Sequence, residues 1–372
     1  MNSMRKLVEM PTGRSIKRFL KASGKKHLLI TGSRGVGKTT LFRKILREIT
    51  GLDQPQIETF AVPKEAVYFH YKQETMQIAS YCEEMPGLSN KMRLNDKLKQ
   101  YGVPILHELS ASQEYWVAID EIGYLETGCQ EYCDALIQLM EEKRLFAVIR
   151  KQEIPFLESI KAREDVCFID LDDIYGQIGC VIMASGESKR FGRNKLLEPF
   201  GDQTVLEKTL QATELPFAKR TVVTRQEAVV ELCKKCGVES RLHQEPNRND
   251  TVRIGLTSLE KVEETIKGCI FSPGDQPLLS KETMEVLVLM IGKQPERIHR
   301  LCYQEKMGMP VYFPRKYFEQ LKHLPIGKGG KYIIQQNLED VILVPAKNQW
   351  ELYDMDTPED FRILLEKQKE LC

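Results

Sequence analysis

The sequence predicts an α/β protein built from two domains, each a three-layer arrangement of one sheet between helices. Three observations lead to this prediction. The chain has 372 residues, which is long for a single hydrophobic core. Short apolar runs alternate with longer amphipathic stretches, as in parallel sheets whose strands are joined by helices. A loop of glycine and basic residues follows an apolar run twice, beginning at Gly32 and at Gly186.

The composition argues against two classes of partner. The formal net charge is +1, so no global basic field favours nucleic acid. Residues 1–26 are basic but lack the apolar core of a signal peptide, and the apolar run at 27–31 is too short to span a bilayer. We therefore expect a cytoplasmic protein that binds neither nucleic acid nor membrane. Its cysteines should stay reduced, and the CxxC at Cys233 and Cys236 lacks a second pair for a zinc site.

The domain boundary is expected in the polar stretch 170–177, which gives domains at 1–175 and 176–372. In the first domain the apolar patterns predict strands at 27–31, 66–71, 115–119, 145–149 and 166–169, and helices at 39–49, 89–101, 129–142 and 155–163. In the second domain they predict strands at 178–184, 220–224, 268–272, 298–303, 309–313 and 341–344. Its helices are expected at 204–213, 226–236, 251–260, 281–291 and 358–371.

The first glycine-rich loop has every fixed position of a phosphate-binding P-loop, with an apolar run before it and an amphipathic stretch after it. Its glycines let backbone N–H groups surround phosphates. Lys38 adds charge at the β- and γ-phosphates, and the Thr39 hydroxyl can bind Mg²⁺. The nucleotide-binding residues expected here are Gly32, Ser33, Arg34, Gly35, Val36, Gly37, Lys38, Thr39 and Thr40.

Two acidic residues end the strand expected at 115–119. Asp120 can hold Mg²⁺ through water, and Glu121 can polarise the water that attacks a γ-phosphate. An acidic pair is often no more than a solvated strand end. The P-loop in the same domain favours the catalytic interpretation.

Three segments of this half carry a family resemblance: ITGSRGVGKTT from Ile30, AIDEIGYLE from Ala118 and LFAVIRKQEIPFLESIKAREDV from Leu145. They resemble the cancer-related nucleoside-triphosphatase family. The resemblance implies a P-loop fold that hydrolyses ATP, GTP and other nucleoside triphosphates with low base selectivity. The chain departs from the family at Arg34, where proline is usual, and at Tyr124-Leu125, where Lys-Met is usual.

The second loop follows the strand expected at 178–184 and carries two cations. Gly186 and Gly192 let it wrap a nucleotide, while Arg190 and Lys195 can neutralise a triphosphate and the leaving pyrophosphate. Taken alone, the pattern also describes an exposed basic loop. The nucleotide-binding residues expected here are Ala184, Ser185, Gly186, Arg190 and Lys195.

Two aspartates are candidate metal ligands for this second loop. Transfer at an α-phosphorus needs a cation such as Mg²⁺ to polarise the phosphoryl oxygens. Asp275 follows an apolar run, at the kind of strand end where open α/β sheets gather ligand groups. Asp356 is the second candidate, although it could equally cap a helix that has Pro358 in its first turn.

Six segments of the second half carry another resemblance: ASGESKRFGRNKLL at 184–197, NDTVRIGL at 249–256, PGDQP at 273–277, GMPVYFP at 308–314, GKGGKYII at 327–334 and DMDTPED at 354–360. Together they resemble the MobA-like NTP transferase family, and all but 249–256 look most similar to its molybdenum cofactor cytidylyltransferase branch. The segment 249–256 resembles cytidylyltransferases such as the methylerythritol phosphate enzyme. The resemblance implies a Rossmann-like fold, nucleotide binding by Asp250 and Thr251, and transfer of CMP from CTP to a phosphorylated pterin. The chain departs at Ser185, where alanine or glycine is usual.

The sequence thus leads to the hypothesis of a bifunctional enzyme. A P-loop nucleoside-triphosphatase domain would hydrolyse ATP or GTP through Lys38 and Glu121. A Mg²⁺-dependent nucleotidyltransferase domain would use Arg190 and Lys195 to stabilise the leaving pyrophosphate. Two rivals stay open: a transferase for a sugar or alditol phosphate, and an NTP-driven adaptor that delivers cofactor to an apoenzyme such as a molybdenum hydroxylase.

Overall fold

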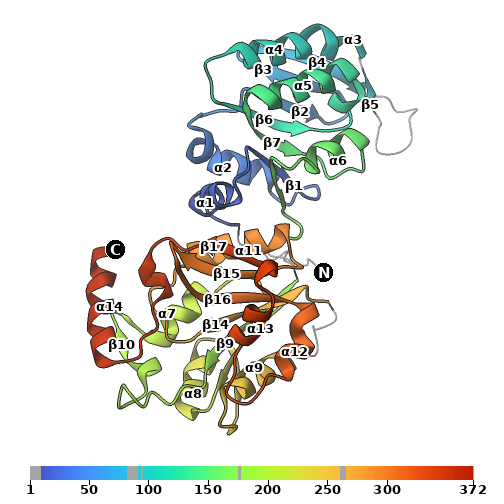
Figure 1. Ribbon diagram of the computed structural model, residues 1–372. Helices are drawn as coiled ribbons and strands as arrows, with labels where there is room; N and C mark the ends of the chain where they lie inside the picture. The colour runs from blue at the N-terminus through green and yellow to red at the C-terminus, as the bar shows by residue number, and fades with distance from the viewer. Residues whose placement is uncertain (1–9, 82–90, 94, 175–176, 260–264, 372) are drawn as a thin grey trace. The chain divides into compact units, whose positions relative to one another are not determined.

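The computed structural model describes residues 10–81, 91–93, 95–174, 177–259 and 265–371. The described chain divides into two compact units. Thr12–Ile174 forms one unit, and the remainder of the described chain forms the other. Each unit has one large sheet flanked by helices (Figure 1). The α/β prediction with two domains is therefore confirmed. No helix in these described ranges is long and apolar enough to cross a membrane.

The first unit contains an eight-stranded sheet in the order β5-β4-β3-β2-β6-β7-β1-β8. Strands β2, β6, β7, β1 and β8 pair in parallel, whereas β2 to β5 form an antiparallel series. The strands are β1 (His27–Thr31), β2 (Ile57–Val62), β3 (Ala66–Tyr71), β4 (Glu74–Tyr81), β5 (Lys91–Arg93), β6 (Trp116–Ile122), β7 (Arg144–Ile149) and β8 (Val166–Asp170).

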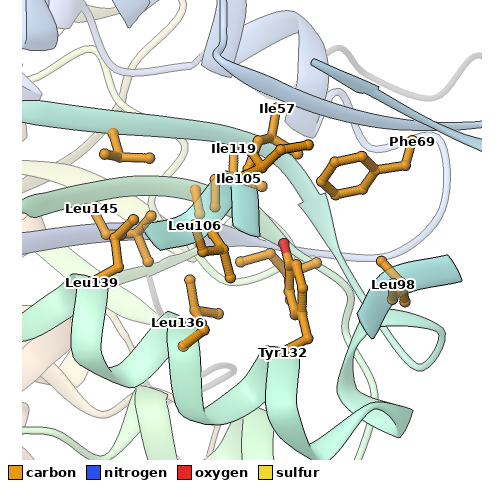
Figure 2. Packing of buried hydrophobic residues seen from close by; sticks show 14 of the residues in the cluster. Ile57, Phe69, Leu98, Ile105, Leu106, Ile119, Tyr132, Leu136, Leu139 and Leu145 are labelled. Carbon is orange, nitrogen blue, oxygen red and sulfur yellow. The ribbon is translucent and has the colours of Figure 1, made fainter. Parts of the chain in front are cut away.

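Helices cover both faces of this sheet because its central strands are apolar on both sides. Leu145 and Ala147 of β7 belong to a core cluster with Leu136 and Leu139 of α5. Figure 2 shows Leu136 and Leu139 directed at the sheet, beside Ile105 and Leu106 of α4. Phe146 points the other way, since side chains alternate along a strand, and contacts Phe42 of α2 with ring centroids 4.4 Å apart.

The helical segments of the first unit differ from the prediction in several places: helices at Gly13–Ser23 and Val103–Ala111 were not expected, and residues 91–93 are not helical. The helical segments are α1 (Gly13–Ser23), α2 (Lys38–Thr50), α3 (Asn95–Lys97), the π-helical turn η1 (Leu98–Gly102), α4 (Val103–Ala111), η2 (Glu126–Gly128), α5 (Gln130–Glu142) and α6 (Pro155–Lys161). The helix expected at 89–101 is wrong for residues 91–93, which form β5 because they pair with β4 at the sheet edge. Residues 89, 90 and 94 lie outside the described residues.

The second unit contains a seven-stranded sheet in the order β13-β12-β9-β14-β16-β15-β17. β16 is antiparallel to both β14 and β15, so this sheet is also mixed. Its strands are β9 (Ile178–Ala184), β12 (Lys219–Thr224), β13 (Glu239–Leu242), β14 (Gly268–Pro273), β15 (Ile298–Tyr303), β16 (Lys306–Pro314) and β17 (Val341–Pro345), beside a small hairpin of β10 (Pro199–Phe200) and β11 (Gln203–Thr204).

Successive side chains of β9 point to opposite faces of this sheet, and each face is covered by different helices. Cys180 and Ile182 pack in a cluster with α7 and α8, while Val181 packs in a cluster with α9, α12 and α13. The helices are α7 (Val205–Ala212), α8 (Glu227–Lys235), α9 (Arg248–Thr257), α11 (Lys281–Lys293), α12 (Phe318–Lys322), α13 (Lys331–Gln336) and α14 (Pro358–Leu371), with short 3₁₀ turns at η3 (Lys195–Leu197), η4 (Arg315–Tyr317), η5 (Leu338–Asp340) and η6 (Gln349–Leu352).

Candidate nucleotide-binding sites

The P-loop joins the carboxyl end of β1 to the amino end of α2. Gly35 and Gly37 have φ values of 79° and 103°, which strain any residue with a Cβ, so glycine is needed for this turn. No side chain caps the first turn of α2, which leaves its N–H groups directed at the loop. The loop is therefore shaped to surround an anion.

Lys38 lies against the loop that precedes it. Its Nζ donates hydrogen bonds to the carbonyl oxygens of Gly32 and Ser33, at 2.8 and 3.0 Å. Burial lowers the pKa of this ammonium, and the nearby Glu121 and Asp172 carboxylates oppose that shift. A phosphate entering the loop would exchange two neutral acceptors of Lys38 for an anionic one.

Asp120 lies near the carboxyl end of β6, beside the first turn of α2. The Thr39 hydroxyl donates a 3.2 Å hydrogen bond to its Oδ1. Its side chain is 4% exposed, and the ion pair with Nε of Arg43 is 3.6 Å long. Burial raises the pKa of Asp120 to about 6, and the Thr39 hydrogen bond only partly opposes this. The buried negative charge of Asp120 is poorly compensated by its neighbours. Its carboxylate, together with the Thr39 hydroxyl, is therefore suited to bind a divalent cation.

Glu121 occupies a β-bulge between β6 and β7. The strand register shifts between Asp120 and Ile122, and Glu121 has a φ of 86°. Few residues other than glycine adopt this conformation, and bulges of this kind redirect a side chain beside active sites. The bulge turns Glu121 into an ion pair with Arg150, and both residues line the P-loop pocket.

That pocket has a volume of about 810 Å³ and includes cations that the sequence analysis did not select. Arg150 and Lys151 follow β7, and Lys151 pairs with Asp170 and Asp172 at 2.8 Å each. Asp172 also accepts hydrogen bonds from the backbone N–H and hydroxyl of Ser33, both at 2.7 Å. The polar stretch expected to be only a boundary therefore holds the P-loop. A charged pair directly after a strand was the signal available for Arg150 and Lys151.

The second basic loop connects β9 to η3, and Lys195 lies at its end. Lys195 is 7% exposed, pairs with Asp275, and approaches Oδ1 of Asp356 at 2.9 Å. Arg190 pairs with the other oxygen of Asp356 at 2.7 Å. β9 and β14 are neighbouring parallel strands, with Met183 opposite Pro273, so their carboxyl ends bring the loop and Asp275 to the same edge. Residues far apart in sequence thus form one charged cluster.

Asp356 does not cap α14, which corrects one of its two expected roles. The cap is Thr357, whose hydroxyl accepts from the backbone N–H of Asp360 at 3.2 Å. In return Asp360 accepts from the N–H of Thr357 at 2.7 Å. Capping therefore leaves the carboxylate of Asp356 to Lys195 and Arg190.

Asp354 adds a third carboxylate to this cluster. Its Oδ1 accepts a 2.9 Å hydrogen bond from Gln276. Burial first, and then the charges of Asp275 and Asp356, raise its pKa to about 6. A cluster whose acid groups repel one another fits an added cation beside Lys195. Nevertheless, no set of three or more His, Cys, Asp or Glu side chains in the described ranges is arranged to hold a metal ion. A cation here would need nucleotide phosphates or water to complete its ligands.

Three of the expected nucleotide-binding residues have structural partners of their own, and a fourth is buried. Asp250 forms a capping box with Asn247 at the start of α9, and Thr251 is buried in the next position. The carbonyl oxygen of Ala184 accepts from the Thr224 hydroxyl. Ser185 lines the pocket beside the loop, and its hydroxyl contacts Nε2 of His243 at 2.8 Å. Nucleotide binding by these residues stays a prediction.

Two adjoining pockets of about 380 and 700 Å³ surround this loop. In the first, every lining cation has an acidic partner: Lys189 and Arg225 pair with Glu187, while Arg190 and Lys195 pair with aspartates. Phosphates would compete with these carboxylates for the same cations. The arrangement suits a triphosphate that enters together with its own divalent cation.

Two family models match the chain. Residues 27–175 match the family described as NTPase, and residues 180–341 match the MobA-like NTP transferase domain. The chain is 30% identical over 151 residues to nucleoside-triphosphatase THEP1 of Thermotoga maritima, which covers 39% of this chain and 86% of that protein. It is 27% identical over 192 residues to a protein of Aquifex aeolicus named probable molybdenum cofactor guanylyltransferase, which covers 50% of this chain and 89% of that protein. A crystal structure of Rv0371c from Mycobacterium tuberculosis H37Rv is 27% identical, with a TM-score of 0.45 over 51% of this chain and 98% of that chain.

Proposed function

Because this chain belongs to the nucleoside-triphosphatase family over residues 27–175 and to the MobA-like NTP transferase family over residues 180–341, we propose that it is a bifunctional enzyme of molybdenum cofactor maturation. One unit hydrolyses ATP, GTP or related nucleoside triphosphates. The other transfers CMP from CTP to molybdopterin and releases pyrophosphate. Both reactions take place in the cytoplasm.

The observation that carries the transferase proposal is the position of Lys195 between Asp275 and Asp356. An oxygen of the acceptor phosphate attacks the α-phosphorus of CTP, and the bond to the β-phosphate oxygen breaks. Lys195 and Arg190 balance the negative charge that gathers on the leaving pyrophosphate. A Mg²⁺ ion held by Asp275 and Asp356 would polarise the phosphoryl oxygens and reduce the repulsion between the two anions.

The hydrolytic proposal rests on the P-loop pocket. Lys38 and the loop N–H groups bind the β- and γ-phosphates, and Thr39 and Asp120 would hold Mg²⁺. Glu121 orients and deprotonates the attacking water once its contact with Arg150 is released. Arg150 is then free to stabilise charge on the γ-phosphate, so that nucleotide binding would assemble the catalytic groups.

The nucleotide base has a second candidate. The Aquifex aeolicus relative is named for guanylyl transfer, which favours GTP as the alternative donor. Ser185, with its contact to His243, lies beside the loop where the base is expected. CTP remains our first choice, because the motifs of this half most closely resemble the cytidylyltransferase branch.

The test incubates the protein with each nucleoside triphosphate in turn, Mg²⁺, and molybdopterin or its molybdenum form. We expect pyrophosphate release and a product heavier by one CMP, identified by mass spectrometry. A GMP adduct would select the second candidate. Pyrophosphate release only with sugar or alditol phosphates would refute the pterin acceptor. Hydrolysis stimulated by a molybdenum hydroxylase apoenzyme, with no nucleotidyl transfer, would instead support an adaptor.

A further inference from the structure

The turn that follows Glu121 is held by a buried carboxyl group of the first unit. Gly123 is the second residue after Glu121, and its backbone N–H donates a 2.8 Å hydrogen bond to Oε2 of Glu126. The carbonyl oxygen of Gly123 accepts in turn from the N–H of Thr127 at 3.0 Å. Glu126 is 2% exposed, so its hydrogen bond to Gly123 is shielded from water. Glu126 therefore closes the turn that begins at the proposed catalytic base.

The same turn lies directly against Arg150, the ion-pair partner of Glu121. The backbone N–H of Arg150 donates to the carbonyl oxygen of Ile122 at 2.9 Å. A Cβ on Gly123 would lie 2.7 Å from Cδ of Arg150, so the backbone at Gly123 packs on the arginine side chain. The position of Gly123 therefore affects both Glu121 and Arg150, which line the P-loop pocket.

Glu126 and Thr59 of β2 line a small cavity of about 10 Å³ that also reaches Glu121 and Arg150. Oε1 of Glu126 and the hydroxyl of Thr59 are buried, and neither has a well-formed hydrogen bond within the described part of the chain. The cavity has about the volume that one water molecule requires, and a water there would satisfy both oxygens. Glu126 would then be fixed through both of its oxygens.

The surroundings of Glu126 disfavour its ionised form. Burial raises the pKa of Glu126, hydrogen bonds that include the one from Gly123 oppose the shift without cancelling it, and the charge of Glu121 adds to it. A protonated carboxyl has one accepting and one donating group, as the amide of glutamine has. In that form Glu126 can accept from Gly123 without placing a second negative charge beside Glu121.

We propose that Glu126 is a positioning residue of the hydrolytic site, which holds the turn at Gly123 so that Glu121 is directed at the attacking water. This inference rests on the proposed hydrolysis through Glu121. Glu121 has a φ of 86°, and a residue with a Cβ persists in that region only when the surrounding structure holds it there. Glu126 is not among the described residues that line the P-loop pocket, so it acts through the backbone rather than on the nucleotide.

The experiment compares Glu126→Met with Glu126→Gln. Methionine is unbranched and of similar size but cannot accept from Gly123 as a carboxyl does, whereas glutamine can. We expect Glu126→Met to lower kcat of hydrolysis about tenfold or more, because a small displacement of a catalytic group slows the chemical step. The nucleotide Kd should change less than about twofold, which also reports that the first unit is folded. Glu126→Gln should stay within about threefold of the wild-type kcat.

Glu351→Met is the matched control for removing a buried glutamate. Glu351 is 1% exposed and accepts from the N–H of Ser280 and the hydroxyl of Thr283 in the second unit. Its replacement should leave kcat of hydrolysis unchanged. Equal losses in Glu126→Met and Glu126→Gln, or wild-type turnover in Glu126→Met, would overturn the proposal.

A double-mutant cycle shows whether Glu126 acts through Glu121. Adding Glu126→Met to Glu121→Gln should lower kcat by less than about twofold more, because the group whose position Glu126 sets has already lost its function. Losses that multiply independently would instead show that Glu126 acts by another route, and the proposal would be wrong.

Hydrogen exchange without nucleotide judges the positioning separately from the activity. The amide hydrogens of residues 121–125 should exchange about tenfold faster in Glu126→Met than in the wild type, while those of residues 116–119 keep their rates. Unchanged exchange at 121–125 would overturn the proposal even if hydrolysis is confirmed. Faster exchange there, in a protein whose wild type hydrolyses no nucleotide, would keep Glu126 as the residue that holds the turn and reject the proposed hydrolysis.

Discussion

The Thr39 hydroxyl donates a 3.2 Å hydrogen bond to Oδ1 of Asp120, and this contact joins the first turn of α2 to the carboxyl-terminal part of β6. Burial raises the pKa of Asp120 from 3.8 to about 6. The folded protein therefore binds this proton more tightly than the unfolded chain does. The stability contributed by the neutral carboxyl is complete below pH 3.8 and is lost as the pH rises through 6.

We accordingly expect Asp120→Asn to stabilise the protein without nucleotide or Mg²⁺ at pH 8. The amide oxygen can still accept from Thr39, but no charge is buried. The gain should be at most about 3 kcal/mol, from about two pKa units. Thermal melting at pH 4 and pH 8 measures it. A melting shift that does not grow with pH would contradict the assignment of a costly ionised Asp120.

Replacing Lys38 and Lys195 one at a time should separate hydrolysis from nucleotidyl transfer. Lys38→Ala should abolish NTP hydrolysis but leave nucleotidyl transfer largely intact, because Lys38 donates its hydrogen bonds to Gly32 and Ser33 of the P-loop in the first unit. Lys195→Ala is the reciprocal control and should remove transfer while sparing hydrolysis. Both activities are followed in the same preparations by phosphate and pyrophosphate release. A proportional loss of both in either variant would rule out two independent sites.

Glu121→Gln should slow hydrolysis about 10²-fold or more while nucleotide and Mg²⁺ still bind, because the amide cannot take a proton from water. Single-turnover hydrolysis and nucleotide titration distinguish these effects. Glu131→Gln is the matched control, since Glu131 pairs with Lys99 on the surface. If turnover is unchanged in Glu121→Gln, the catalytic base must be sought elsewhere, first at Asp120.

Asp275→Asn should lower transfer about 10²-fold or more, because the side chain keeps its volume but loses the charge for Lys195 and Mg²⁺. Melting should change little. Asp202→Asn, which removes an exposed partner of Lys208, is the control. Transfer at the wild-type rate with wild-type Mg²⁺ dependence would exclude Asp275 as a ligand and direct attention to Asp356 and Asp354.

The strands that carry both loops could be predicted, because β1, β9 and β14 are buried on both faces and form continuous apolar runs. β4 could not be predicted in this way. It lies in the antiparallel part of the sheet, where polar residues such as Thr75 and Gln77 alternate with apolar ones. α1 was missed although Ile16, Phe19 and Leu20 follow a capping Thr12 at helical spacing, so that signal was present.

Site residues could be predicted where a local motif fixes their position. They could not be predicted where contacts between distant segments fix it. Lys38, Asp120, Lys195 and Asp275 lie in motifs whose backbone context fixes their positions. Asp172 could not be predicted, because its contact with Ser33 exists only once distant strands are paired. The cap of α14 was ambiguous because Asp356 and Thr357 are both good capping residues, and only the hydrogen bonds distinguish them.

The position of β1 between β7 and β8 has a consequence for synthesis on the ribosome. Both hydrogen-bonded neighbours of β1 are made much later than β1 itself. The backbone N–H of Ser33 cannot form its hydrogen bond to Asp172 until 139 further residues have been synthesised. At bacterial and eukaryotic elongation rates this delay is roughly 7–30 s. During that time the apolar strand before the P-loop has no sheet partner, so the nascent chain is a natural client for chaperones until β8 emerges.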